Sequence, residues 1–413
     1  MAFRTRTEAA VTAPIGARID VAPDITATTP ENQAPTFRNQ DQVWPVRVIR
    51  RGDAVRPLPP HARSLEDLTF EASGARLGIG DLMARRRMAG LLILKHGEIA
   101  LECYGMGNVP ESRWTSMSVA KSITATLVGA ALHDGAIGGL DDRCEQYLPR
   151  LRGSAYEGVT IRNLLRMCSG VAWREENDAD GRSEVYRLGK AMVSRRPGSV
   201  LDLLCKLPRA QPQGVVFNYS TGESCLIAAL VVAATGRPLA DYCTDTIWGP
   251  AGMEADGHWQ LESESGLELG GLGVSARLRD FGRFGQLVLE DGEAFNGRRV
   301  LPSGWRDLAG QPDSAPTGFG RLMPGSPLGY GYHWWVAPHL PGGVNNGAFS
   351  ANGAYGQIIF VNPAEQVVIA ILSAWRQSQD NDAGVEIVAM IRAAVRALRT
   401  EPASQAPERQ LDR

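Results

Sequence analysis

The chain has 413 residues, of which 44% are hydrophobic and 21% are charged, and its formal net charge is −2. This length predicts two or three domain-sized units with ample core. The near-neutral charge balance argues against nucleic acid or an anionic membrane surface as a partner. No run is long and apolar enough to span a bilayer, and residues 1–8 are not followed by the apolar core of a secretory signal. We therefore expect a cytoplasmic protein.

Cysteine and histidine are too scattered along the chain to suggest a metal centre. The sequence has six of each, with no CxxC pair and no HxH or HExxH pattern. Buried, reduced thiols are the expected state of the cysteines. We predict neither a metal nor a cofactor.

Prolines recur through residues 1–60 and interrupt regular structure over most of that range. We predict a partly disordered N-terminal arm, of which residues 44–49 pack on the body. The first regular elements follow it. Apolar patterns predict a helix over 79–87 and a β-hairpin with strands over 88–95 and 98–104.

Helical patterns and loops dominate residues 134–255. Thr160 is the expected N-cap of one helix, and Gly170 its expected C′ residue. Residues 173–190 are polar and charged, and we predict a loop over a cleft there. A second apolar helix is predicted over 222–235.

Strand patterns return after about residue 268. The predicted strands cover residues 330–336, 356–361 and 366–372. A short helix begins at residues 301–305, a final helix covers 383–398, and residues 401–413 form a polar tail. No repeat of fixed period is present.

This order of elements predicts an α+β fold, with an antiparallel sheet flanked by helices. Residues 61–133 and 256–400 would form an α/β domain around that sheet. Residues 134–255 would form an inserted, mostly helical domain. We expect a functional cleft between the two.

The stretch most suggestive of chemistry is residues 114–122, WTSMSVAKS, which leads into an apolar helical pattern. Thr115 or Ser116 is the expected N-cap, which puts Ser118 in the first turn and Lys121 one turn later. Positions i and i+3 share a helix face, so the hydroxyl and the amine can meet. A lysine whose amine loses its proton can activate a serine nucleophile. The alternative is a capped helix with an incidental lysine.

Two further polar clusters could complete such a site. Residues 217–224, FNYSTGES, precede a helix and contain Tyr219, whose phenol could relay a proton to a leaving group. Residues 347–357, GAFSANGAYGQ, are small and glycine-rich, so that a substrate can approach the backbone. A backbone N–H here, with that of Ser118, could form an oxyanion hole. Taken singly, each cluster is better explained without chemistry, the first as a buried aromatic at a helix start and the second as an ordinary glycine-rich turn.

In combination, these clusters resemble the serine hydrolases of the class C β-lactamase and penicillin-binding-protein superfamily. The resemblance is strongest to the 6-aminohexanoate-dimer hydrolase (nylon-oligomer hydrolase) branch, and it covers about residues 36–395. The motifs that carry it are WTSMSVAKS at 114–122, GSAYEGVTIRNLL at 153–165, GVSA at 273–276 and RDFGRFG at 279–285.

The resemblance implies a β-lactamase/transpeptidase-like fold and a role for each matching residue. Ser118 would be the acylated nucleophile, Lys121 its base and Tyr219 the proton relay. The backbone N–H groups of Ser118 and Ala351 would form the oxyanion hole, a register set by aligning residues 353–357 with the family's third motif. The further substrate-binding residues implied are Asn352, Gly353 and Tyr355. Residues 173–190 would correspond to a mobile loop over the substrate.

Two departures from the β-lactamase pattern point away from strong β-lactamase activity. Tyr-x-Asn is replaced by Tyr219-Ser220-Thr221, and Lys-Thr-Gly by residues 348–350, AFS, which offer no lysine for a β-lactam carboxylate. We therefore expect a linear small-molecule amide or ester as substrate. A short-chain carboxylesterase, an acyltransferase, a weak β-lactamase or DD-peptidase and, last, a non-catalytic sensor remain alternatives. The sequence leaves the oligomeric state open, a homodimer included.

Overall fold

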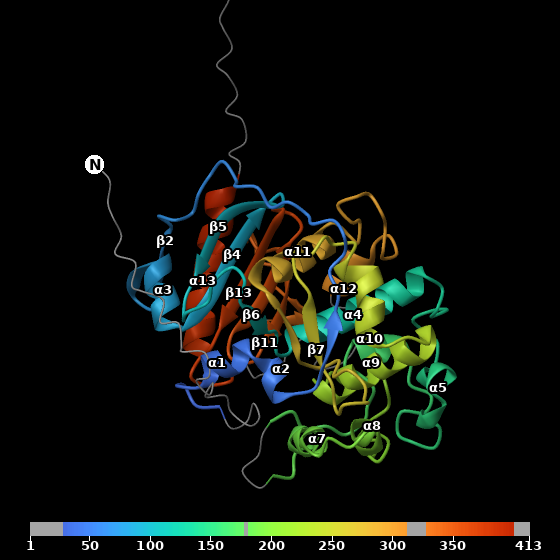
Figure 1. Cartoon of the computed structure of the whole chain (residues 1–413). Helices are drawn as coiled ribbons and strands as arrows, with labels where there is room; N and C mark the ends of the chain where they lie inside the picture. The colour runs from blue at the N-terminus through green and yellow to red at the C-terminus, as the bar shows by residue number, and fades with distance from the viewer. Residues whose placement is uncertain (1–27, 177–180, 312–327, 400–413) are drawn as a thin grey trace, which may run out of the picture.

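The computed structural model describes residues 28–176, 181–311 and 328–399 (Figure 1). The helices are α1 (Gln33–Arg38), α2 (Gln40–Val43), α3 (Ile79–Arg85), α4 (Val119–His133), α5 (Cys144–Tyr147), η2 (Pro149–Leu151), α6 (Ile161–Leu165), α7 (Glu184–Val193), α8 (Ser199–Leu204), α9 (Thr221–Thr235), α10 (Leu239–Cys243), η3 (Thr244–Trp248), α11 (Leu278–Leu289), α12 (Trp305–Gly310) and α13 (Asn381–Leu398). The strands are β1 (Val46–Ile49), β2 (Thr69–Ala72), β3 (Ala75–Gly78), β4 (Met88–Lys95), β5 (Glu98–Tyr104), β6 (Arg113–Thr115), β7 (Gly257–Gln260), β8 (Val274–Arg277), β9 (Gly329–Tyr330), β10 (Trp335–Val336), β11 (Phe349–Gly353), β12 (Gln357–Asn362) and β13 (Val367–Ser373).

Among the described residues, the largest sheet is antiparallel and has seven strands in the order β5-β4-β13-β12-β11-β10-β9. The chain enters it by the β4–β5 hairpin and returns to it only after residue 328. Strand β13 therefore pairs with β4 although some 270 residues separate them. The β-lactamase-type fold expected from the sequence has this arrangement, and the α+β prediction is confirmed.

Helices cover both faces of this sheet, as alternation along β4 requires. Leu92 and Leu94 belong to the core cluster that includes α11. Leu91 and Ile93 belong to a second cluster, which includes residues of α13. Figure 1 shows α11 and α13 on opposite sides of β4 and β13. Since β4 is buried on both faces, its sequence is an unbroken apolar run before Lys95.

A four-stranded antiparallel sheet, in the order β1-β7-β8-β6, leads the chain to the candidate site. Its strand β6 ends at Thr115, three residues before Ser118. Helix α4 then runs between α9 and the large sheet, so nearly every residue in it is buried. The helices α5 to α10 gather on one side of the molecule (Figure 1).

Several elements match the sequence prediction closely. Strands β4 and β5 have the predicted bounds, and β12, β13, α9 and α13 agree to within two residues. The Thr160 N-cap is confirmed, because its side chain accepts a hydrogen bond from the Asn163 N–H. Helix α9 ends at Gly236 in the left-handed conformation, which glycine adopts without steric cost.

Other predicted elements differ from the structure. Helix α6 ends at Leu165, so Gly170 is not its C′ residue. Within residues 173–190, Ser183 caps α7, a helix that the charged sequence obscured. The strand predicted over 330–336 is two short strands, β9 and β10, separated by a turn. Helix α11 was not predicted.

The arm is also more ordered than predicted from residue 28 onward. Helix α1 contains Pro35, which is tolerated because it lies in the first turn, where the N–H has no intrahelical partner. Strand β1 pairs with β7, as the expected packing of residues 44–49 requires. The disorder predicted for residues 1–27 and the tail at 401–413 fall outside the described residues. The division into domains stays a prediction.

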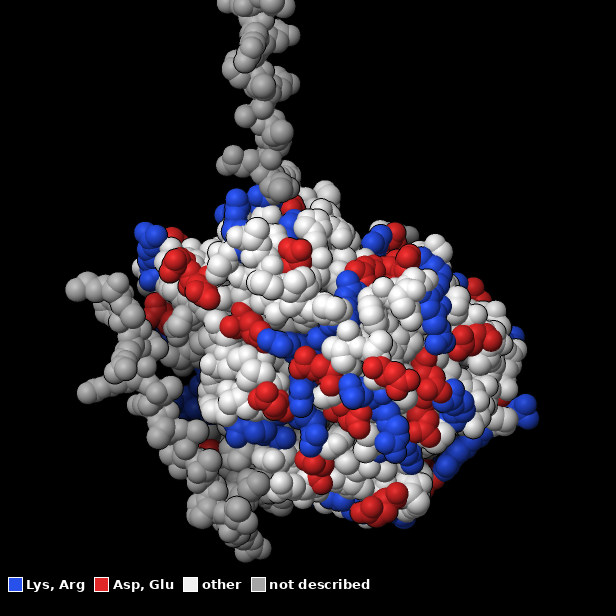
Figure 2. Space-filling view, turned by 45° about the horizontal axis from the view of Figure 1, so that its top comes forward, with Lys and Arg blue, Asp and Glu red and all other residues white. Residues whose placement is uncertain are grey.

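Charges of both signs are interleaved on the face shown in Figure 2. Within the described ranges, no single helix combines the length and the apolar composition needed to cross a membrane. Helix α9 meets that test only together with the segment Leu239–Trp248, from which it is bent by 76°.

Candidate active site

The turn from β6 into α4 presents Ser118 to solvent. Thr115 belongs to β6 and Ser118 itself occupies the N-cap position of α4, which corrects the predicted N-cap at Thr115 or Ser116. The preceding Met117 has φ 48°, a left-handed conformation that is uncommon for a residue other than glycine. Such strain persists only where the surroundings impose it, and here the Ser116 N–H is anchored to the Val274 carbonyl at 2.6 Å. The backbone is held in a conformation that directs Ser118 outward.

Ser118 and Lys121 meet as the i, i+3 spacing predicted. Lys121 Nζ lies 2.8 Å from Ser118 Oγ and donates a second hydrogen bond to the Gly271 carbonyl, also at 2.8 Å. The lysine is 1% exposed, whereas Ser118 is only half-buried. Among the described residues, no carboxylate lies within ion-pair distance of this amine. The arrangement puts an amine between two neutral oxygens, one of which belongs to an accessible hydroxyl.

Gly271 reaches Lys121 because two glycines pass close to α9. A Cβ added at Gly271 would lie 2.7 Å from the Thr221 carbonyl oxygen. A Cβ added at Gly270 would lie 2.4 Å from the Ser224 carbonyl oxygen. Only glycine permits this approach, which carries the Gly271 carbonyl to the lysine. Sequence analysis missed this residue, although the Gly-Gly dipeptide was a visible signal.

Tyr219 lies beside the Ser118–Lys121 pair, as predicted. Lys121 Nζ is 5.0 Å from the centroid of the Tyr219 ring, within cation–π range. The ring stacks on Trp335, with centroids 5.6 Å apart, and meets Tyr330 edge-on at 6.0 Å. Tyr219 is 9% exposed and Trp335 is 7% exposed, so both rings are largely fixed by packing. The structure therefore brings together three residues from two separate segments.

Thr221, at the position where β-lactamases carry an asparagine, is occupied by an internal contact. Its N–H and its hydroxyl both donate to Glu175, the former at 2.9 Å. Glu175 also accepts from Trp173 Nε1 at 2.6 Å. The carboxylate therefore holds the start of α9 to the segment that follows α6. Sequence analysis did not identify this contact.

Strand β11 passes directly beside the nucleophile. A Cβ added at Gly353 would lie 2.7 Å from the Ser116 carbonyl oxygen and 3.0 Å from Met117 Cβ. The absence of a side chain at Gly353 therefore lets the end of β11 contact the residues that precede Ser118. This places the third predicted cluster next to the first.

The register of β11 decides which of its N–H groups face the open side. The Ala337 N–H donates to the Ala348 carbonyl at 2.9 Å, so the carbonyl of Ala348 faces β10. Since peptide groups alternate along a strand, those of Asn352 face the same side, beyond the start of β10 at Trp335. Those of Ala351 face β12, where Ala351 is paired with Ile359. This geometry does not support the predicted use of the Ala351 N–H in an oxyanion hole.

Tyr355, predicted to bind substrate, lies in the turn between β11 and β12 at φ 62°. Its ring packs on Phe37 of α1 with centroids 5.3 Å apart. Its N–H donates to the Ser378 carbonyl, and its carbonyl accepts from the Trp375 N–H. These contacts favour a structural role, in which Tyr355 joins the N-terminal helix to the turn after β11.

A buried acid lies beneath the same helix start. Glu223 is fully buried, and burial raises its pKa to about 8, against the lowering effect of the hydrogen bond from Ser169. Its Oε2 has no partner among the described residues. Within the same residues, no group of three or more His, Cys, Asp or Glu side chains could hold a metal ion.

Comparison with known proteins shows the family of this chain. The chain matches the beta-lactamase family over residues 78–391. It is 29% identical over 351 residues to the 6-aminohexanoate-dimer hydrolase of Paenarthrobacter ureafaciens, with 82% of this chain and 84% of the relative covered.

Solved structures show the same fold. One is described as "Putative 6-aminohexanoate-dimer hydrolase from Bacillus anthracis"; its TM-score is 0.80 at 22% identity, and 92% of this chain and 97% of that chain are covered. Another is described as "EstCE1, a hydrolase with promiscuous acyltransferase activity", with a TM-score of 0.60, 19% identity, and 76% and 98% coverage.

The fold and the site define a hydrolase of the serine β-lactamase type. The chain belongs to the beta-lactamase family, and the 6-aminohexanoate-dimer hydrolases are among its homologues.

Proposed function

We propose that this protein cleaves a linear amide or ester through an acyl-enzyme on Ser118, with Lys121 as base and Tyr219 as proton relay. The observation that carries the proposal is the 2.8 Å approach of Lys121 Nζ to Ser118 Oγ, in a buried setting where the described residues bring no carboxylate within ion-pair distance of the amine. The contact holds a potential base within hydrogen-bond distance of a potential nucleophile. The relative from Paenarthrobacter ureafaciens supports an amide as the substrate.

The first half-reaction forms the acyl-enzyme. Uncharged Lys121 accepts the Ser118 proton as the hydroxyl oxygen attacks the substrate carbonyl carbon. The tetrahedral intermediate collapses and the bond to the leaving nitrogen or oxygen breaks. Tyr219 gives its phenolic proton to that atom and recovers one from the Lys121 ammonium. Water then attacks the acyl carbon, and its proton passes to Ser118 through the same residues in reverse order. This step releases the acid and restores Ser118.

The oxyanion needs two donors, and the strand register favours Asn352 over Ala351 as the second. The Ser118 N–H donates no hydrogen bond within the described residues. The Asn352 N–H lies on the open side of β11, next to the turn that carries Ser118. We infer that these two backbone N–H groups bind the oxyanion. Asn352 thus contributes its backbone N–H, and Gly353 lets the end of β11 approach the residues that precede Ser118.

The residues that replace the β-lactamase motifs support a linear substrate. Ala348 and Phe349 are buried, and Phe349 packs edge-on against Trp334 with centroids 5.1 Å apart. Thr221 is engaged by Glu175. The described part of these two motifs therefore offers neither a lysine for a β-lactam carboxylate nor an amide for its side chain.

An esterase or acyltransferase on the same acyl-enzyme is the second candidate, and the structural likeness to EstCE1 keeps it open through the shared fold. Initial rates on 6-aminohexanoate dimer and on p-nitrophenyl butyrate, with and without an added alcohol acceptor, separate the three activities. A preference for the dimer supports the amidase.

The nucleophile is tested by replacing Ser118. We expect Ser118→Ala to abolish hydrolysis of p-nitrophenyl butyrate and labelling by a fluorophosphonate probe. Ser194→Ala, at an exposed serine after α7, is the matched control and should retain both. Hydrolysis by Ser118→Ala at the parent rate would refute the assignment. A parent protein that the probe does not label would favour a non-catalytic sensor.

A further inference from the structure

The turn between β9 and β10 contains a buried histidine that contacts the helix of the nucleophile. His333 is 2% exposed and adopts φ 60°, the left-handed conformation. Its Nδ1 lies 3.2 Å from the carbonyl oxygen of Lys121. Since a carbonyl can only accept, Nδ1 carries the proton and donates. Nε2 has no partner among the described residues.

Two more hydrogen bonds join the same turn to the helices on either side. The Ser122 hydroxyl donates to the His333 carbonyl at 2.6 Å. The His333 N–H donates to the Leu165 carbonyl, at the end of α6, at 3.2 Å. Both residues 121 and 122 of α4 are therefore tied to His333. Rotation of this turn of α4 about its axis, which would move the Lys121 amine, is opposed at two adjacent positions.

The same short segment also holds the other half of the site. Trp335 stacks on the Tyr219 ring, and Tyr330 meets that ring edge-on. Tyr330 and Trp335 in turn pack on each other, with centroids 4.8 Å apart, across the β9–β10 pair. Residues 330–335 therefore contact Lys121 through His333 and Tyr219 through Trp335.

His333 can hold this position without adding charge. Burial lowers its pKa to about 3, against the raising effect of the hydrogen bond to the Lys121 carbonyl. An imidazole with this pKa is neutral at neutral pH. A neutral donor orients the Lys121 backbone without repelling a proton that arrives at Nζ.

We propose that His333 is a positioning residue, whose Nδ1–H bond to the Lys121 carbonyl sets the approach of the lysine amine to Ser118. The proposal rests on the proposed function, since it assigns a role in Ser118 acylation. His333 does not contact the reacting atoms, so it acts through Lys121.

Two substitutions separate the hydrogen bond from the ring and from the backbone conformation. Both His333→Asn and His333→Gly tolerate a left-handed φ and remove the imidazole. Only asparagine retains an N–H donor at the place of Nδ1. We expect His333→Gly to lower kcat and the rate of fluorophosphonate labelling about 10- to 100-fold, as a misplaced catalytic group does, with KM within about threefold. His333→Asn should recover most of this loss.

The outcomes are distinct. Labelling of His333→Gly at the parent rate would overturn the proposal. Equal loss in both variants, in step with the loss of thermal stability, would also overturn it, because a merely structural role predicts that result. If the parent itself is not labelled at Ser118, the proposed function fails and the positioning role fails with it.

Discussion

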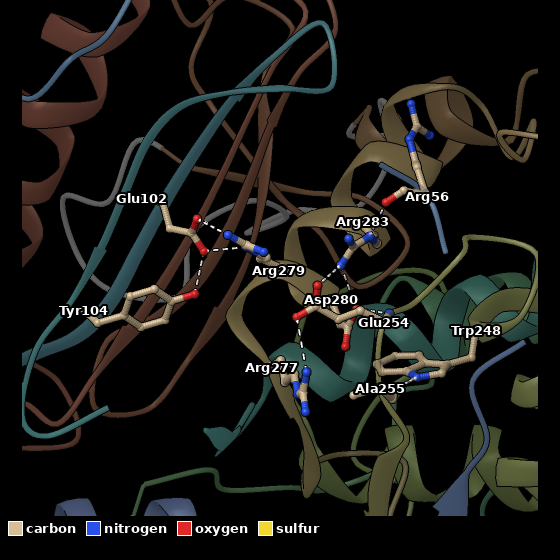
Figure 3. A network of polar contacts seen from close by, with 10 residues as sticks. All are labelled: Arg56, Glu102, Tyr104, Trp248, Glu254, Ala255, Arg277, Arg279, Asp280 and Arg283. Carbon is tan, nitrogen blue, oxygen red and sulfur yellow. Dashed lines mark hydrogen bonds and ion pairs between the residues drawn. The ribbon is translucent and has the colours of Figure 1, made fainter. Parts of the chain in front are cut away.

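Two basic side chains are buried in the helices α4 and α11, and their partners differ in kind. Lys121 is 1% exposed, and its amine meets only neutral oxygens among the described residues. Arg283 is 3% exposed and forms ion pairs with Asp280 at 3.0 Å and with Glu254 at 3.1 Å. Figure 3 shows the contacts of Arg283 with these two carboxylates, while Arg279 of the same helix points away to Glu102 on β5.

This difference separates Arg283, which stabilises the fold, from Lys121, which we propose takes part in the reaction. Arginine stays charged in proteins, so its burial requires partners, and Arg283 has two. Lysine, unlike arginine, can lose its proton and act as a base. The packing around Arg283 has a cost of its own, since burial raises the pKa of Asp280 to about 6. A buried lysine with no acid partner among the described residues is therefore the more informative of the two.

Among the substitutions that test this comparison, replacing Lys121 should have the largest effect, and the effect should be on kcat. Lys121→Met keeps the length of the side chain and removes the amine. We expect kcat for p-nitrophenyl butyrate to fall about 10²- to 10⁴-fold, the range for loss of a general base, with no loss of unfolding free energy. Steady-state kinetics and urea unfolding measure the two effects.

A second buried lysine provides the matched control. Lys95 is 5% exposed and donates to the Glu365 carbonyl at 2.6 Å, at the far end of β4 from the site. Lys95→Met should leave kcat unchanged. A full loss of activity in Lys95→Met, or parent activity in Lys121→Met, would contradict the assignment.

Replacing Arg283 should have the opposite profile. Arg283→Met leaves buried Asp280 without its cation and Glu254 with only the more distant Arg277, at 3.6 Å, so we expect a loss of about 3–5 kcal/mol in unfolding free energy. The kcat of the folded fraction should stay near the parent value. Arg279→Met removes a more exposed ion pair, in which the Arg279 side chain is 35% exposed and the partner is Glu102. This substitution should lower the unfolding free energy by about 1 kcal/mol or less. Equal stability of the Arg283 and Arg279 variants would show that the comparison is false.

These contrasts also show what the sequence could and could not reveal. The Ser118–Lys121 contact was predictable because it follows from i, i+3 spacing within one helix. The Gly271 carbonyl and the His333 ring reach Lys121 from positions 150 and 212 residues away, and no local pattern encodes such distances. Tyr219 was identified only because its cluster, in combination with the others, resembles a known family.

Errors in predicted elements have local causes. Helix α11 was missed because Asp280 and Arg283 are polar residues that it buries, which obscures its apolar face. The prediction of Ala351 rested on alignment, which gives the position of a strand residue without the direction of its N–H. That direction follows from the pairing of β10 with β11, which only the structure provides.

Glu223 is a third buried ionisable group, an acid with an unpartnered oxygen, and its effect should appear in the pH dependence of stability. Burial raises its folded pKa to about 8 from 4.5. Between these values the native state holds a proton that the unfolded state has lost. Parent stability should therefore fall by about 1.4 kcal/mol per pH unit as pH rises through this window.

Glu223→Gln should remove this contribution. The difference in unfolding free energy between parent and variant should be constant below pH 4.5 and should shift in favour of the variant as pH rises to about 8. Urea unfolding of both proteins at several pH values measures it, and all other ionisable groups cancel in the difference. A difference that does not change with pH would mean that Glu223 is ionised in the fold.

The smallest effect tests whether the oxyanion is met by backbone rather than by side chain. In the proposed mechanism the tetrahedral intermediate carries a negative charge, which we expect fixed backbone N–H groups to stabilise. Asn352→Ala keeps the N–H and removes the amide, so kcat for p-nitrophenyl butyrate should change by less than about threefold, whereas loss of a true oxyanion donor costs 10²- to 10³-fold. A hundredfold loss in Asn352→Ala would assign the stabilisation to the side-chain amide. A side chain that the sequence alone had already suggested would then stabilise the oxyanion, and the register of β11 would no longer explain that stabilisation.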